Sequence, residues 1–231
     1  MIGIICALRI EVEGIQKMMT NSTTTDYARM TFVKGEINGK EVVAVECGIG
    51  KVNAAICAQA MIDLFKPEAI INSGIAGALN DKISIGDIVI AKDVVQHDMD
   101  GTEMGDPPGE IWFNDERKIY IDADEKVHNC LLEACKTLED TKVISGRIAT
   151  GDTFVAAVER RLTIGGKFDA DSCEMEGGAI GQVCYRNGVP FGILRCISDD
   201  ITQNEFMDFE KFRILAGDKS VKAILQFVEK Y

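Results

Sequence analysis

Short apolar runs alternate with longer amphipathic segments along the chain. Five apolar runs predict buried strands, at residues 2–8, 68–73, 87–96, 143–150 and 191–197. Five segments with apolar residues at helical spacing predict helices, at residues 11–19, 53–65, 124–138, 176–186 and 209–228. Because strands separated by helices pack as layers, this pattern favours an α/β fold.

Turn signals refine the picture. Asn38-Gly39 joins two strand-like segments, 29–37 and 41–47, and Asn-Gly is a strong hairpin signal. The hairpin adds an antiparallel pair, so we expect a mixed sheet. The segment 97–114 fits neither pattern and is expected to be a long loop. No shift in composition marks a boundary, so residues 1–231 are expected to form a single domain.

The charge balance excludes several partners. The 231-residue chain has a formal net charge of −12, which repels phosphate backbones and anionic lipid, so we expect no nucleic-acid and no membrane partner. No charge-free run is long enough for a membrane span, and the N-terminus has no basic leader. Eight scattered cysteines and only two histidines indicate a reducing compartment and no metal site. We therefore expect a cytoplasmic protein without a cofactor.

Candidate chemistry is expected where strands end, because ligands in open α/β sheets bind beyond the carboxyl ends of the strands. Carboxylates, glycines and one aromatic residue gather there. They are Glu11, Gly48-Ile49-Gly50-Lys51, Ser73-Gly74-Ile75-Ala76-Gly77, Gly151-Asp152-Thr153-Phe154, Glu174-Met175-Glu176, and Arg195 with Ser198, Asp199 and Asp200.

The segment Gly48-Ile49-Gly50-Lys51 has some features of a phosphate-binding loop. A P-loop needs a glycine five residues before its Gly-Lys pair and a Ser or Thr after it, but Val45 and Val52 stand at these positions. The third glycine of a dinucleotide fingerprint is also missing. A tight turn with close backbone approach is the simpler interpretation.

Taken in order, these segments resemble the 5′-methylthioadenosine/S-adenosylhomocysteine nucleosidases, within the wider nucleoside phosphorylase and nucleosidase family. The resemblance rests on Glu11, Cys47-Gly-Ile-Gly-Lys-Val52, Asn72-Ser-Gly-Ile-Ala-Gly77, Gly86-Asp-Ile-Val89, His97-Asp98, Gly151-Asp-Thr-Phe154, Glu174-Met-Glu176 and Arg195-Cys-Ile-Ser-Asp199. Cys47 stands where many relatives have Ser. The match runs from residue 1 to the last helix. It implies a three-layer α/β/α fold with a mixed, twisted central sheet, of the phosphorylase/hydrolase type.

The resemblance also implies an activity, the hydrolysis of the N-glycosidic bond of 5′-methylthioadenosine and S-adenosylhomocysteine. Asp199 resembles the general acid that protonates adenine at N7. Glu11 resembles the base that positions the attacking water, with Arg195 beside it. Glu176 resembles the acceptor for the ribose hydroxyls, with Met175 under the sugar.

Further residues resemble the walls of the nucleoside site. Phe154 is similar to the ring stacked on adenine, and the backbone of Val155 to the group that reads the adenine edge. Ile49 and Phe209 resemble wall residues near the sugar and thioether. Met104, with Pro107 or Pro108, resembles a part donated by a partner subunit, which implies a homodimer. The implied substrate-binding set also includes Glu174, Ile75 and Ser198.

The chemistry of the reaction agrees with these roles. N-glycosidic cleavage passes through a cation-like ribosyl group, and adenine leaves poorly until N7 is protonated. Two separated carboxyl groups, one on the base side and one on the water side, meet this need as they do in inverting glycosidases. A carboxylate can accept hydrogen bonds from both hydroxyls of a diol. An uncharged thioalkyl tail requires an apolar pocket.

Each residue also has a structural interpretation. Glu11 suits the first turn of a helix, where it meets the helix dipole. Asp199 suits a cap, and Phe154 suits a core position. Ile75 departs from the family, because many members have Ser there, close to the water and the ribose. Ile cannot donate a hydrogen bond, so the water is expected to depend more on Glu11 and Arg195. Gly101 replaces a larger apolar residue, which leaves the tail preference open.

Other functions remain as alternatives. A phosphorylase needs arginines around a phosphate dianion. The family's phosphorylases carry one near the position of Asn72 or Ser73 and another in the first loop, and Arg9 is the only basic residue near Glu11 here. Water is therefore the expected nucleophile. A nucleosidase for AMP or futalosine, and a storage protein built on the same fold, are the remaining alternatives.

Overall fold

The computed structural model describes residues 1–201 and 209–231, with side chains described for 1–201 and 218–231. The helices are α1 (Arg9–Lys17), α2 (Lys51–Phe65), α3 (Glu125–Cys135), α4 (Val158–Phe168), α5 (Gly177–Asn187), α6 (Phe209–Lys230) and the 3-10 turn η1 (Thr102–Met104). The strands are β1 (Ile2–Cys6), β2 (Thr20–Tyr27), β3 (Met30–Ile37), β4 (Lys40–Glu46), β5 (Ala69–Ala78), β6 (Ile88–Gln96), β7 (Ile111–Trp112), β8 (Arg117–Lys118), β9 (Tyr120–Asp122), β10 (Val143–Thr150), β11 (Ser172–Glu174) and β12 (Phe191–Asp199).

The main sheet has the strand order β11-β10-β6-β12-β5-β1-β4-β3-β2, and β9 pairs with β6. β1 lies parallel to β4 and β5, and β12 lies parallel to β5. β3 pairs antiparallel with β4 across Asn38-Gly39, where both residues have positive φ, so the predicted hairpin and the mixed sheet are confirmed. β11 also pairs antiparallel with β5. The strands β5, β12, β6, β10 and β11 therefore close into a ring.

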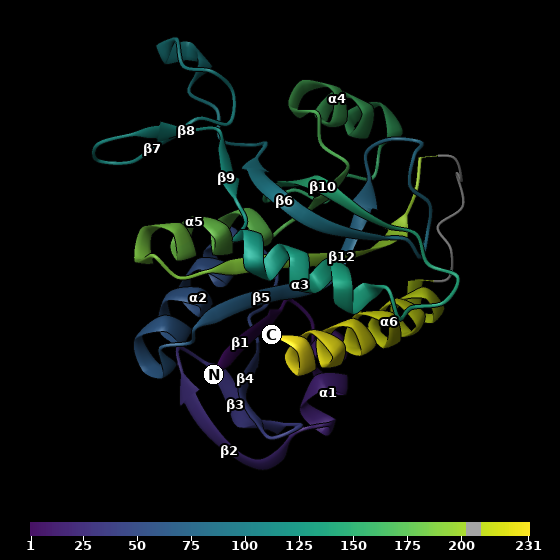
Figure 1. The fold of residues 1–231 in the computed structure, drawn as a ribbon. Coiled ribbons are helices and arrows are strands. Elements are labelled where there is room, and N and C mark those ends of the chain that lie inside the picture. The colour runs from purple at the N-terminus through teal and green to yellow at the C-terminus, as the bar shows by residue number, and fades with distance from the viewer. Residues whose placement is uncertain (202–208) are drawn as a thin grey trace.

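Helices cover both faces of the sheet (Figure 1). On one face α6 packs between α1 and α3, and on the other α2 packs against α5. Each pair of layers encloses an apolar core: Ala58, Met61 and Ile180 contribute to one, and Val12 and Phe227 to the other. The three-layer α/β/α architecture expected from the sequence is confirmed.

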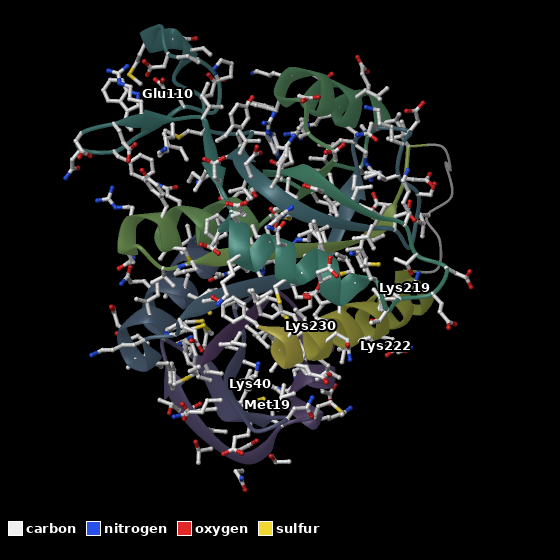
Figure 2. All side chains as sticks on the ribbon, viewed as in Figure 1. Met19, Lys40, Glu110, Lys219, Lys222 and Lys230 are labelled. Atoms are coloured by element: carbon white, nitrogen blue, oxygen red, sulfur yellow. The ribbon has the colours of Figure 1, made fainter. Side chains whose placement is uncertain are left out.

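The long helix α6 is fixed to the sheet near its middle and at its C-terminal end. Lys219 donates a hydrogen bond to the Gly86 carbonyl before β6, at 3.0 Å, and Lys40 on β4 donates to the Glu229 carbonyl, at 3.1 Å (Figure 2). A lysine that reaches the last carbonyls of a helix supplies a partner those groups lack within the helix. Between these points Phe227 is fully buried.

Apart from the short elements η1, β7, β8, β9 and β11, two longer elements were absent from the sequence-based expectation. β2 is exposed at every position, so no alternation of apolar residues marks it, and it forms the edge of the sheet against β3. α4 buries Arg161, Ile164 and Phe168, at helical spacing. The arginine on its buried side and the Gly165-Gly166 pair conceal that helix in the sequence.

Strands β5 and β12 run further than predicted, and this changes the setting of the site. β5 continues to Ala78, so Gly74 and Gly77 lie within the strand and not in a loop after it. β12 continues to Asp199, and its pairing with β5 shifts register between Ile197 and Asp199. The long segment 97–114 contains η1 and β7 but is otherwise irregular, as expected.

A pair of glycine substitutions tests the packing of α3 on the sheet. A Cβ at Gly192 of β12 would lie 2.5 Å from Val127 and 2.8 Å from Leu131, both on α3. Gly192→Ala is therefore expected to destabilise the protein by about 1–3 kcal/mol through overpacking. Exposed Gly166 in α4 has no neighbour within 4 Å of such a Cβ, so Gly166→Ala is expected to stabilise by about 0.5–1 kcal/mol. Urea unfolding measures both, and equal effects would contradict the packing.

Candidate active site

A cavity of about 140 Å³ opens at the carboxyl ends of β1, β5 and β12. It brings together residues from loops and strands that lie far apart in the sequence. The predicted site residues that line it are Glu11, Ile49, Ile75, Phe154, Glu174, Met175, Glu176, Arg195, Ser198 and Asp199. Ala7, Leu8, Gly74, Ala76, Gly77 and Cys173 complete the lining.

Three predicted residues are not among those that line the cavity. Val155 is buried beside it, and its carbonyl accepts a hydrogen bond from Arg161. Met104 is 75% exposed on η1. Phe209 is the first residue of α6, and its side chain lies outside the described residues.

Glu11 is buried in the first turn of α1. Its carboxylate accepts hydrogen bonds from the Leu8 amide at 2.9 Å and from the Ile75 amide at 3.2 Å. Burial raises the pKa of Glu11, and the positive charge of Arg195 opposes that rise. Ile75 therefore fixes Glu11 through its backbone N–H, which any residue other than proline supplies at this position.

Gly74 leaves room for Glu11 and Arg195. A Cβ at Gly74 would lie 2.9 Å from an Arg195 guanidinium nitrogen and 3.0 Å from a Glu11 carboxylate oxygen. Both side chains thus lie against the same strand residue, as the resemblance implied. Only a glycine permits this close approach without a shift of the carboxylate or the guanidinium.

Arg195 and Glu174, whose side chains are 1% and 2% exposed, form a buried ion pair in the wall of the cavity. Arg195 also donates to the Asn72 side chain at 2.5 Å, and Glu174 accepts from the amides of Glu176 at 3.0 Å and Gly177 at 2.7 Å. Burial alone would raise the pKa of Glu174, but Arg195, the Thr150 hydroxyl and these amides outweigh it and hold the pKa below its ordinary value. Glu174 is therefore an anchor for Arg195.

Glu176 directs its carboxylate toward the cavity at the start of α5. One oxygen accepts from the Gly50 amide at 2.9 Å, and the other lies 3.7 Å from Arg195. Burial, and after it the negative charge of Glu174, raise the pKa of Glu176 to about 7. A carboxyl group with this pKa titrates near neutral pH and responds to what binds beside it.

Asp199 ends β12 beside Gly77 of β5, three residues along that strand from the Gly74 that borders Glu11. Ser198 donates its hydroxyl to one carboxylate oxygen at 2.5 Å, and Arg161 of α4 forms an ion pair with the other. The register shift between Ile197 and Asp199 changes the direction in which the strand end presents its side chains. Sequence reasoning missed Arg161, because the helix α4 that carries it was not predicted. The one signal available was the helical spacing of Arg161 with Ile164 and Phe168.

The turn Gly48-Ile49-Gly50-Lys51 is not organised as a phosphate cradle. Gly48 and Gly50 have positive φ, as a tight turn requires. The Gly50 amide is used by Glu176, and the Lys51 amide donates to Asp152 at 2.7 Å. The Lys51 ammonium donates to Asp98 at 2.7 Å and to Gln96 at 3.2 Å. The lysine therefore ties the turn to the loops that follow β6 and β10.

The mouth of the cavity is apolar. Ile49 and Phe154 line it and are exposed, whereas Met175, between Glu174 and Glu176 in the sequence, is partly buried. Within the described ranges, no group of three His, Cys, Asp or Glu side chains is arranged to hold a metal ion. No described helix is long and apolar enough to cross a membrane.

Comparison with known proteins identifies the family. The model of the phosphorylase superfamily matches residues 1–229. The 5′-methylthioadenosine/S-adenosylhomocysteine nucleosidase of Shewanella halifaxensis is 36% identical over 230 residues, which cover 99% of each chain. The nucleosidase of the same name from Neisseria meningitidis, solved with methylthio-immucillin-A, superposes with a TM-score of 0.92 at 31% identity, over 100% of this chain and 99% of that one.

A related enzyme of different specificity is also similar. The futalosine hydrolase of Helicobacter pylori superposes with a TM-score of 0.90 at 30% identity, over 100% of this chain and 97% of that one. The nucleosidase relatives match in sequence at full length as well as in fold, and the resemblance of the site motifs agrees with them. The chain therefore belongs to the phosphorylase superfamily and, within it, to the 5′-methylthioadenosine/S-adenosylhomocysteine nucleosidases.

Proposed function

We propose that this protein hydrolyses the N-glycosidic bond of 5′-methylthioadenosine and S-adenosylhomocysteine, releasing adenine and the 5-alkylthioribose. The observation that carries the proposal is the pair of carboxylates, Glu11 and Asp199, on one cavity that also holds Glu176. Two carboxylates with different neighbours, one beside Arg195 and one beside Arg161, suit the separate tasks of a base and an acid.

Asp199 is the general acid in this proposal. Its O–H bond breaks as the proton moves to N7 of adenine, the C1′–N9 bond breaks, and its electron pair stays with adenine. Glu11 accepts a proton from the water whose oxygen bonds to C1′ on the opposite face of the sugar. Arg195 beside Glu11 keeps that carboxylate available as a base by opposing the effect of burial. The bonds that break and form in these steps balance without a cofactor.

Glu176 accepts hydrogen bonds from the ribose hydroxyls, and Met175 packs under the sugar. Phe154 stacks on adenine, and the backbone of Val155 reads its edge. Ile49 and Phe209 border the sugar and the thioether, while Ser198 and the Ile75 backbone hold Asp199 and Glu11 in place. Glu174 contributes to substrate binding indirectly, because its carboxylate is paired with Arg195 and holds that guanidinium in place.

Water is proposed as the nucleophile in preference to phosphate. Among the residues whose side chains are described, Arg195 is the one guanidinium that lines the cavity, and it is held by Glu174 and Asn72. Phosphorolysis needs cations that remain free to meet a dianion. Futalosine is the alternative nucleoside, favoured by the similarity to the Helicobacter pylori hydrolase.

We further propose a homodimer. Val52 and Ile56 of α2 are 68% and 47% exposed, and exposed apolar groups that lie one helical turn apart mark a surface suited to a second copy. Met104 is exposed and is not among the residues that line this chain's own cavity, as expected of a side chain that completes a partner's pocket.

The proposal includes one domain over residues 1–231, supported by the family model over residues 1–229. It also includes a cytoplasmic location. All eight cysteines are free thiols, which suits a reducing compartment.

The hydrolytic activity is tested with 5′-methylthioadenosine in phosphate-free buffer. The wild type is expected to release adenine and methylthioribose. Asp199→Asn removes the acid at constant shape and is expected to lower kcat about 10²–10⁴-fold. Product analysis by chromatography separates the outcomes. Release only after phosphate is added would make the protein a phosphorylase, and release from futalosine alone would make it a futalosine hydrolase.

The pH dependence tests Glu176. Because the pKa of the free enzyme's Glu176 is raised to about 7, the protonated form prevails below that pH and is a poorer acceptor for the diol. The value of kcat/KM is expected to fall as the pH drops through about 7. Glu176→Gln is expected to remove this inflection and to lower kcat/KM about tenfold to a hundredfold. An inflection that persists in the variant would assign it to another group, such as Glu11.

The homodimer is tested by sedimentation velocity. The wild type is expected to sediment as a dimer at micromolar concentration. Val52→Asp places a charge on α2 and is expected to shift the protein toward monomer, whereas Thr24→Asp on the exposed edge strand β2 leaves the dimer unchanged. A wild type that stays monomeric would refute the proposed dimer.

A further inference from the structure

Arg161 is a buried cation at the edge of the cavity that the roles given above leave unused. It is 4% exposed on α4, the helix that follows the Phe154 loop. Burying an arginine costs free energy unless its charge and its donors are met. The contacts of Arg161 therefore indicate which groups its charge and its N–H donors stabilise.

The guanidinium joins three points that belong to the site. It forms an ion pair with one carboxylate oxygen of Asp199. Its Nε donates to the Val155 carbonyl at 2.8 Å, and a terminal nitrogen donates to the Asp200 carbonyl at 3.4 Å. One planar group thus connects the residue proposed as the acid with the backbone proposed to read adenine.

The sheet provides space for this pair. A Cβ at Gly77 of β5 would lie 3.0 Å from the same Asp199 oxygen and 3.5 Å from the central carbon of the Arg161 guanidinium. Ser198 holds the other carboxylate oxygen at 2.5 Å. The carboxyl group of Asp199 is therefore confined by a strand on one side, by the Ser198 hydroxyl at one oxygen and by the charge of Arg161 at the other.

We propose that Arg161 is a positioning residue that acts on the leaving group through Asp199, a role that rests on the proposed function. When Asp199 passes its proton to N7, the carboxylate that remains lies against a fixed positive charge. That charge stabilises the product of proton transfer without reorganisation, because Arg161 is already held by two carbonyls. The hydrogen bond from Arg161 to the Val155 carbonyl keeps the Asp199 carboxyl aligned with adenine, the group that Asp199 protonates.

The test compares two leaving groups. Adenine needs protonation to leave, whereas 4-nitrophenolate does not. Arg161→Met is expected to lower kcat for 5′-methylthioadenosine about tenfold to a hundredfold. With 4-nitrophenyl 5-methylthioribofuranoside, whose departure needs no acid, the same variant is expected to keep kcat within about threefold of the wild type.

Coupling to Asp199 is the second measurement. In an Asp199→Asn background the acid is absent, so adding Arg161→Met is expected to change kcat for 5′-methylthioadenosine by less than about twofold. Arg161→Lys keeps a positive charge but loses the planar guanidinium that also donates to the Val155 carbonyl. Its kcat is expected to fall between those of the wild type and Arg161→Met. If the methionine variant does not fold, the lysine variant carries the comparison of the two substrates.

Arg160→Met is the matched control, because Arg160 is the exposed neighbour of Arg161 and its substitution is expected to leave both substrates unaffected. Equal losses on both substrates, or additive losses with Asp199→Asn, would overturn the proposal and make Arg161 a structural ion pair. A wild type that acts on neither substrate would refute the proposed function itself.

Discussion

The buried ion pair between Arg195 and Glu174 is the constraint on which the rest of the site depends. Neither charge is accessible to solvent, so each needs the other and the polar groups around them. Removing one partner of such a pair typically costs about 3–5 kcal/mol, because the remaining charge stays buried. The amides at the start of α5 and the Thr150 hydroxyl complete the shell around Glu174.

This pair also sets the charge of the cavity. Three carboxylates, Glu11, Glu174 and Glu176, lie around one guanidinium, so the positive charge is shared unequally. Glu174 interacts most strongly with the Arg195 charge and has a lowered pKa, whereas Glu11 and Glu176 have raised pKa values. The difference arises from distance and hydrogen bonding, since all three groups are buried. A single arginine thus gives three chemically similar side chains different protonation behaviour.

Much of this could be predicted from the order of the residues. The buried strands, the Asn38-Gly39 hairpin and most helices follow from periodicity and turn chemistry. The places of Glu11 and Asp199 after predicted strands, and of Glu176 before a predicted helix, indicate that they gather at one edge of the sheet. Arg161 could not be predicted, because its partners come from other elements and its own helix carries a polar residue on the buried side. The continuation of β5 through Gly74 and Gly77 was hidden because glycine usually signals a turn.

The closed ring of strands has a consequence for how the site tolerates change. Gly77 of β5 is paired with Asp199 on β12 and with Cys173, the residue before Glu174, on β11. Asp199, the proposed acid, and the strand that carries Glu174, the ion-pair partner of Arg195, are therefore both aligned to one backbone position. In an open sheet a slipped strand relaxes toward a free edge, but a ring has no such edge there. A one-residue insertion in β5 would displace both halves of the site together, whereas a change of length in the loops that border the cavity leaves this pairing intact.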